Sequence, residues 1–146
     1  MMQQKLSDLS EDERERLEKQ RSFVRDHYDP DSRHLYDTLK GKLDLLGTIL
    51  DASWINADET WKLQSLGVTF GDALAQELAL HWILVEDQYG KDPALHDPGT
   101  TIILFPLTSI SKRIVKGERV DVRQLFDEAC KTVNRLRAEL PSAGPH

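Results

Sequence analysis

The sequence predicts an α+β fold, a mainly helical single domain with a small antiparallel β-hairpin sheet packed between helices. Most segments place apolar residues three and four positions apart, which is the spacing of one helix face. Two stretches differ, at about residues 80–89 and 100–105, because β-branched, aromatic and aliphatic side chains dominate them and Gly, Pro and Asp border them. They predict two strands joined by a structured loop, with three helices before the strands and two after.

Length and composition favour one globular domain, which we expect over residues 1–140. The chain has 146 residues, of which 39% are hydrophobic and 30% are charged, a balance typical of a folded domain rather than a disordered one. Residues 141–146 contain Pro and Gly and no large apolar side chain, so they predict a flexible tail.

Charge and cysteine content narrow the range of partners and locations. A formal net charge of -6 repels nucleic acid and anionic membranes at long range, so we expect neither as a partner. The single cysteine, Cys130, permits no intramolecular disulfide and fits a small buried residue better than a nucleophile. The N-terminal residues lack the apolar core of a signal peptide, and no apolar run has the length of a membrane span. The expected location is therefore the cytoplasm.

Capping signals mark the three helices that precede the strands. Ser10 with Glu13 forms a capping box for a helix that ends near residue 26. The break around Pro30 begins a second helix, whose leucines at 35, 39, 43, 46 and 50 share one face. Asn56 with Glu59 resembles a capping box at the start of a third helix, which is expected from about residue 57 to residue 78.

Two further helices follow the strands. Pro106 suits the first position of a helix that Gly117 closes, and Asp121 with Gln124 begins a last helix that ends near Leu140. The apolar faces of all elements together predict a common core. Its expected members are Leu39, Leu46, Phe70, Leu74, Trp82, Leu104, Ile110 and Phe126.

Glycines inside the predicted helices indicate close packing or a break. Gly67 and Gly71 lie one turn apart on the apolar face of the third helix. Glycine costs about 1 kcal/mol relative to alanine inside a helix, so its presence on a buried face predicts that another backbone or a strand approaches there.

A combination of short motifs over about residues 58–130, preceded by two helices, resembles a known family. The motifs are Leu66–Asp72, Trp82, Val85–Asp87, Gly90–Pro93, Pro98–Thr100, Phe105–Pro106, Ile110–Arg113, Gly117–Glu118 and Asp121–Val122. Together they are similar to a small bacterial domain-of-unknown-function family, number thirty-eight-oh-six in the usual naming. The resemblance implies a bacterial origin, and it implies no mechanism.

Polar residues gather in the predicted hairpin loop, residues 86–97. Glu86, Asp87, Asp92, His96 and Asp97 carry oxygen and nitrogen atoms of the kinds that bind divalent cations. Their spacing matches no known binding loop, and turn or capping roles explain the acids that stand beside prolines. We therefore assign no catalytic or metal site and no cofactor, and keep a small-molecule or metal-dependent enzyme at residues 86–97 as the alternative.

Basic residues after the second predicted strand suggest two other uses. Lys112 or Arg113 can pair with Glu86 or Asp87 and brace the hairpin against the following helix, with Arg113 favoured because its planar guanidinium binds a carboxylate at two points. In the other interpretation, the basic residues dock an acidic surface of a partner protein. That basic set comprises Lys112, Arg113, Lys116, Arg119 and Arg123.

The sequence thus favours a non-enzymatic cytoplasmic protein-interaction or accessory module. The candidate binding or bracing residues are Trp82, Glu86, Asp87, Asp92, Lys112 and Arg113. A convergent polar pocket in the hairpin would favour the enzyme, whereas a closed and braced hairpin would favour the interaction module.

Overall fold

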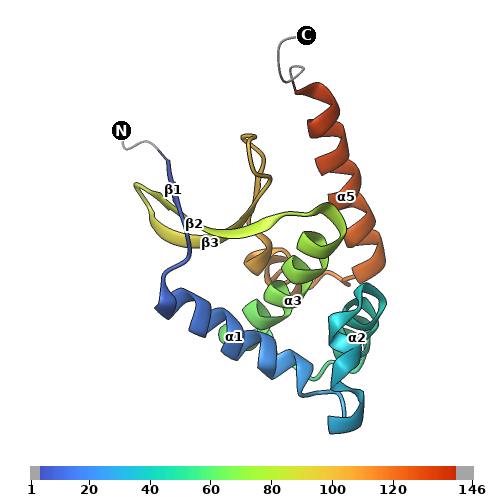
Figure 1. Cartoon of the computed structure of the whole chain (residues 1–146). Helices are drawn as coiled ribbons and strands as arrows, with labels where there is room; N and C mark the ends of the chain where they lie inside the picture. The colour runs from blue at the N-terminus through green and yellow to red at the C-terminus, as the bar shows by residue number, and fades with distance from the viewer. Residues whose placement is uncertain (1–3, 141–146) are drawn as a thin grey trace.

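The central element of the fold is the helix α3, Thr60–Leu78, as Figure 1 shows. The computed structural model describes residues 4–140. Every residue from Ser65 to Gly71 is buried, because other elements pack around α3 on several sides. A helix that is buried around most of its circumference belongs to the interior of a domain. The fold is therefore organised around α3 rather than around the hairpin.

Helices surround α3 and connect the N-terminal and C-terminal parts of the chain. α1, α2, α4 and α5 all contact α3, as does the short 3-10 helix η2. The bounds of the helices are α1 Glu11–Arg25, η1 Pro30–Asp37, α2 Leu39–Asp51, η2 Pro106–Thr108, α4 Ser111–Val115 and α5 Val122–Glu139. None of the helices within residues 4–140 is both long enough and apolar enough to span a bilayer.

The sheet has four antiparallel strands in the order β1-β2-β3-β4. The strands are β1 Lys5–Ser7, β2 His81–Asp87, β3 Gly90–His96 and β4 Ile103–Leu104. The predicted mainly helical α+β class is confirmed, and both predicted strand stretches contain a strand. These two strands are not neighbours, however, because β3 lies between them, and β1 was not expected from the sequence.

The expectation of a structured loop after β2 was wrong because the chain reverses at once. Asp87 pairs with Gly90 in the register of the hairpin, and the Asp87 Oδ1 accepts a hydrogen bond from the Tyr89 backbone N at 2.8 Å. Gly90 has a φ of 130°, which glycine adopts without steric cost. Pro93 lies beyond the part of β3 that β4 covers, where a strand tolerates a missing backbone donor.

Both faces of the sheet contain buried side chains, as the apolar pattern predicts. Leu95 and Leu84 belong to the face that also carries Trp82, and Val85 and Ala94 belong to the opposite face. Trp82 packs against α3, where its ring would be the nearest neighbour of a side-chain carbon placed on Gly71. This contact fixes the orientation of the sheet relative to the central helix.

Capping residues in the sequence predicted most helix ends correctly. The Ser10 Oγ accepts from the Glu13 backbone N at 3.2 Å, and the Asp121 Oδ1 accepts from the Gln124 backbone N at 3.1 Å, so both predicted caps are confirmed. The second predicted helix is instead split into η1 and α2, because Thr38 is extended and caps α2. The fourth is split into η2 and α4.

The predicted core is present around α3. Leu46, Phe70, Leu74, Ile110 and Phe126 are buried, and the rings of Phe70 and Phe126 meet edge to face at 6.3 Å between centroids. The three remaining predicted members are partly buried at the margin of the same cluster, namely Leu39, Trp82 and Leu104.

The close approach predicted at two glycines of α3 is confirmed. A side-chain carbon built on Gly67 would lie 2.4 Å from the Leu107 backbone oxygen, and one on Gly71 would lie 2.6 Å from the Trp82 ring. The missing side chains thus allow η2 and β2 to pack directly on α3. Residues 141–146, predicted as a flexible tail, lie outside the described residues.

Candidate functional site

Two acidic residues of the hairpin, Glu86 and Asp87, have local structural contacts. Glu86 forms an ion pair with Lys91, its direct neighbour across the hairpin, at 3.6 Å. Asp87 accepts the turn hydrogen bond from Tyr89, and Asp92 is exposed opposite Val85.

The polar residues of segment 86–97 do not converge on one site. The register places Glu86 and Asp92 on opposite faces of the sheet, because neighbouring side chains alternate along a strand. His96 lies at the far end of the hairpin, opposite His81, and its Nε2 is 2.8 Å from the Thr100 carbonyl oxygen. Within residues 4–140, no group of three or more His, Cys, Asp or Glu side chains is arranged to hold a metal ion.

The predicted brace between the hairpin and the basic helix is not formed. Arg113 donates from its Nη1 to the Ser109 carbonyl oxygen at 3.0 Å, and Lys112 is exposed. Within the described part of the chain, neither cation pairs with a carboxylate. Glu86 and Asp87 contact Lys91 and the Tyr89 backbone within the hairpin instead. Whether these residues bind a partner stays a prediction.

The polar brace of this fold is centred on Asp72 instead. Asp72 lies on α3 with a side chain only 11% exposed, and its Oδ2 accepts from Arg21 Nε at 2.6 Å and from the Tyr36 hydroxyl at 2.7 Å. Its Oδ1 accepts from Arg21 Nη2 at 2.9 Å and from Trp82 Nε1 at 3.0 Å. The carboxylate therefore ties α1, η1 and β2 to α3, and Trp82 has a bracing contact.

Burial and charge act together on the partners of Asp72. Burial lowers the pKa of Arg21, but hydrogen bonds to Asp72 and its negative charge outweigh burial, so the net pKa lies above its ordinary value. Burial and the charge of Asp72 both raise the pKa of the Tyr36 hydroxyl above its ordinary value. The cluster is thus a charged Arg21–Asp72 pair with a neutral tyrosine, which suits a structural role.

The sequence carries a partial signal for this brace. Asp72 is the one charged residue in the apolar run that extends from Leu66 to Leu74. A carboxylate inside such a run needs partners when it is buried. The identity of those partners was not evident, because Arg21 and Tyr36 lie 51 and 36 residues away in the sequence.

A second clamp joins α5 to the sheet and to α3. Arg137 Nε pairs with Asp97 Oδ2 at 2.9 Å, and the Asp97 side chain is largely buried. Another nitrogen of Arg137 donates to the Leu78 carbonyl oxygen at the end of α3. Asp97, which the sequence assigned to a turn, therefore also anchors the last helix.

The thiol of Cys130 is not activated. Burial raises the pKa of this partly buried cysteine, and the charges of Glu77 and Asp127 raise it further. A higher pKa leaves less thiolate, which is the reactive form.

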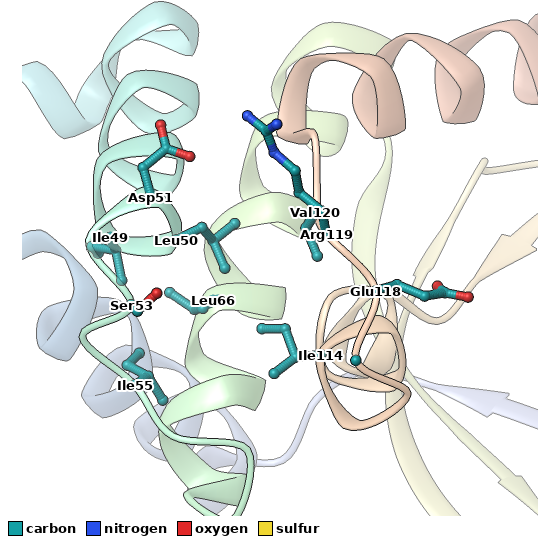
Figure 2. A pocket seen from close by; sticks show the side chains of 11 residues that line it. Ile49, Leu50, Asp51, Ser53, Ile55, Leu66, Ile114, Glu118, Arg119 and Val120 are labelled. Carbon is teal, nitrogen blue, oxygen red and sulfur yellow. The ribbon is translucent and has the colours of Figure 1, made fainter.

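A depression lies between α2 and the connection from α4 to α5, and Figure 2 shows it from close by. It has a volume of about 590 Å³ and is open to solvent. Aliphatic side chains from α2, α3 and α4 form its walls, among them Leu50, Leu66 and Ile114. The complete lining is Ile49, Leu50, Asp51, Ser53, Ile55, Leu66, Ile114, Gly117, Glu118, Arg119 and Val120. We name this depression the α2–α4 groove.

A smaller depression of about 390 Å³ adjoins the α2–α4 groove. The two share Asp51, Arg119 and Val120, so they lie side by side, and we call the pair the channel. The smaller depression is more polar, since it includes Asp44 and Arg123, which form an ion pair across it. The channel therefore has an apolar part and a polar part.

Two exposed tryptophans pack against residues at and just after the C-terminal end of α1. Trp54 is 55% exposed and follows Ser53, which lines the groove, and Trp61 is 44% exposed at the start of α3. The His27 ring stacks on Trp54 at 5.7 Å, and Phe23 meets Trp61 edge to face at 5.6 Å. Tryptophan is enriched at the energetic centres of protein interfaces.

No local pattern in the sequence predicts the channel. Its walls come from residues near 50, from α3 and from residues 114–123. Three separate segments must fold together before it exists, and each segment shows only an ordinary apolar face.

Comparison with known families identifies the class to which this small α+β domain belongs. The family model described as Domain of unknown function (DUF3806) matches residues 42–126, which is more than half of the chain. The chain belongs to this family, which confirms the resemblance and extends it toward the N-terminus into α2. All residues that line the α2–α4 groove fall inside the matched segment.

Solved structures support the fold. The chain is similar to a protein from Bacteroides thetaiotaomicron VPI-5482 whose crystal structure was determined at 1.50 Å resolution, with a TM-score of 0.69 and 15% sequence identity. The match covers 87% of this chain and 47% of that one, so the chain spans about half the length of this structural relative. No curated protein matches the chain.

Proposed function

We propose that the chain is a non-enzymatic, cytoplasmic protein-interaction module whose partner binds along the α2–α4 groove. The observation that carries the proposal is a solvent-open depression whose walls include the partly exposed aliphatic side chains of Leu50, Ile55 and Ile114. Its volume of about 590 Å³ falls in the range of ordinary ligand pockets. The polar residues of the hairpin do not come together around one comparable site.

The apolar walls supply the main driving force in this proposal. Burying one leucine or phenylalanine side chain of a partner against the partly exposed Leu50, Ile55 and Ile114 contributes about 1.5–3 kcal/mol. Trp54 extends the contact surface beyond the groove, and a rigid aromatic side chain loses little conformational entropy on binding.

The exposed cations of α4 and of the segment that follows it favour a partner with an acidic surface. Lys112, Lys116 and Arg119 are exposed, and within the described residues none of them forms an ion pair. An acidic partner would be attracted to this face despite the net charge of -6 of the whole chain. Nucleic acid is less suited, because the remaining surface repels its phosphates.

Site-specific photo-crosslinking tests the proposal. A benzophenone amino acid at Leu50 in the groove should capture a discrete partner from an extract of the native cells. The same probe at Tyr89, on the exposed tip of the hairpin, is the matched control and should capture none. A discrete product at Tyr89 with none at Leu50 would contradict the proposed surface, and so would identical products at both positions.

A further inference from the structure

We infer that a depression between α5 and the segment from β4 to α4 binds a free α-amino acid with an apolar side chain. The depression has a volume of about 280 Å³, and its lining includes Phe70 and Leu74 of α3, which are both buried. We name it the α5 notch. It shares no lining residue with the α2–α4 groove, so it is a site separate from the proposed interaction surface.

The α5 notch offers apolar surface that a ligand can cover. Phe105 is 45% exposed, and Leu104 and Leu125 are partly exposed. The hydroxyl groups of the lining are engaged by nearby backbone. The Ser109 Oγ donates to the Phe105 carbonyl oxygen at 3.5 Å, and the Thr132 Oγ1 donates to the carbonyl oxygen four residues before it at 3.0 Å. An aliphatic or aromatic side chain can therefore be buried there without leaving a polar group unpaired.

One cation and one anion belong to the α5 notch. Among the lining residues in the described part of the chain, Arg113 and Glu128 alone are charged. Both also line a neighbouring depression of about 180 Å³, so both lie at the end of the notch where the two depressions meet. Arg113 belongs to α4 and Glu128 to α5, so the two charges come from opposite walls. The notch thus combines an apolar part with one charge of each sign at one end.

Both charged groups keep hydrogen-bonding capacity for a ligand. Arg113 donates from Nη1 to the Ser109 carbonyl oxygen, and Glu128 accepts from the Gln124 side chain at Oε1, so one atom of each group is used locally. Within residues 4–140 neither group forms an ion pair, either with the other or with a third residue. The neighbouring depression adds Arg119 and Asp121, one charge of each sign, and leaves the balance unchanged.

An α-amino acid carries the groups that match this arrangement. Its carboxylate and its ammonium group are bonded to one carbon atom, so they can pair with Arg113 and Glu128 from the space between the two walls. Its side chain then extends along the apolar part of the notch. A fatty acid or an aliphatic amine satisfies only one of the two charges, and a peptide chain separates its charged ends.

A ¹⁵N–¹H NMR titration of the full chain with L-leucine tests the inference. Binding should shift the backbone amide signals of residues 104–113 and 124–132 and leave those of the α2–α4 groove unchanged. Three comparison compounds each lack one feature: leucinamide the carboxylate, N-acetylleucine the ammonium group and glycine the apolar side chain. Each should bind at least about fivefold more weakly than L-leucine.

Two substitutions with matched controls assign the charges. Glu128→Gln should weaken L-leucine binding about fivefold and remove its advantage over N-acetylleucine. Asp127→Asn, at an exposed neighbouring position outside the lining, should change neither. Arg113→Gln should likewise remove the advantage of L-leucine over leucinamide, and Lys112→Gln should preserve it. The amide spectrum of each variant shows that it is folded.

Three results would overturn the inference. The first is no shift of the amide signals around the α5 notch up to the solubility limit of L-leucine. The second is equal binding of L-leucine and either of its singly charged derivatives by the wild type. The third is an equal loss of affinity in Glu128→Gln and Asp127→Asn, since a specific contact requires the carboxylate that lines the notch.

Discussion

Asp72 concentrates more of the tertiary hydrogen bonding than any position we singled out from the sequence. Its carboxylate accepts from Arg21, Tyr36 and Trp82, which come from three different elements. A buried pair of this kind contributes little net free energy when intact, because both charges are desolvated, but removing one partner leaves an uncompensated charge. The contribution of Asp72 to stability is therefore best measured by substituting it and recording the change in the free energy of unfolding.

Asp72→Asn should lower the free energy of unfolding by about 3 kcal/mol, since Arg21 then stays partly buried without its anionic partner. Urea denaturation measures the change. Asp26→Asn breaks the exposed ion pair with Arg33 and is the control, with an expected loss of about 0.5 kcal/mol or less. Equal effects of the two substitutions would mean that the Asp72 cluster is no more than a surface network.

Tyr36 should make stability fall at high pH. A tyrosine whose pKa is higher in the folded state than in the unfolded state contributes stability that is fully present below its unfolded pKa of about 10 and is lost as the pH rises above that value. The free energy of unfolding should therefore fall more steeply for the wild type than for Tyr36→Phe between about pH 9 and about pH 11. A difference between the two proteins that does not change with pH would contradict this assignment.

The pairing of charges was the part of the site that the sequence did not reveal. Arg113 was expected to pair with Glu86 or Asp87, yet Glu86 pairs with Lys91 across a tight turn. A local partner loses less chain entropy than a distant one, so it forms the contact first. The Arg21–Asp72 pair forms over 51 residues because α1 and α3 already pack together there.

Helix ends that depend on neighbouring residues were predictable from the sequence. Strands that depend on pairing with another strand were less predictable. The caps at Ser10 and Asp121 need only a side chain and a backbone N–H three residues away, so the local sequence contains them. β1 has three residues and exists only because β2 offers an open edge. β3 contains Pro93, which disfavours a strand unless its missing donor faces an unpaired edge.

Two glycines of the helices should respond in opposite ways to alanine. Gly67→Ala brings a methyl group against the Leu107 backbone, which cannot move without displacing η2, so we expect a loss of about 1–3 kcal/mol or more. Gly47→Ala meets no atom within 4 Å inside α2 and should gain about 0.5–1 kcal/mol through helix propensity. Thermal and urea denaturation measure both changes. A neutral Gly67→Ala would show that η2 is not held against α3.

The fold class was predictable at the scale of the whole molecule because the apolar faces of the helices and strands point to one core. What the sequence did not indicate was which element occupies its centre. The hairpin carries the most distinctive residues, but α3 is the element that α1, α2, α4, α5 and η2 all contact. Which element lies at the centre depends on how the apolar faces of all the elements pack against one another. The sequence of a single segment does not contain that information.

Leu74→Ala should destabilise the whole molecule rather than one part of it. Leu74 is buried in the central helix beside Phe70, and its truncation leaves a cavity worth about 2–5 kcal/mol. Amide hydrogen exchange should accelerate together in α1, α2 and α5. Val115→Ala, at an exposed position of α4, should change stability by less than about 0.5 kcal/mol. Faster exchange confined to α3 would contradict a shared core.

The Asp72 brace has a consequence for how the family segment can be handled on its own. The matched residues 42–126 include Asp72 and Trp82 but leave out Arg21 and Tyr36. A fragment excised at those limits would keep a carboxylate on its central helix and discard the guanidinium and the hydroxyl that neutralise and solvate it. It would also lose α1, which covers one side of α3. The segment that the family model matches thus lacks two of the partners of Asp72, so we expect that a version of the domain made for grafting or expression should begin before α1.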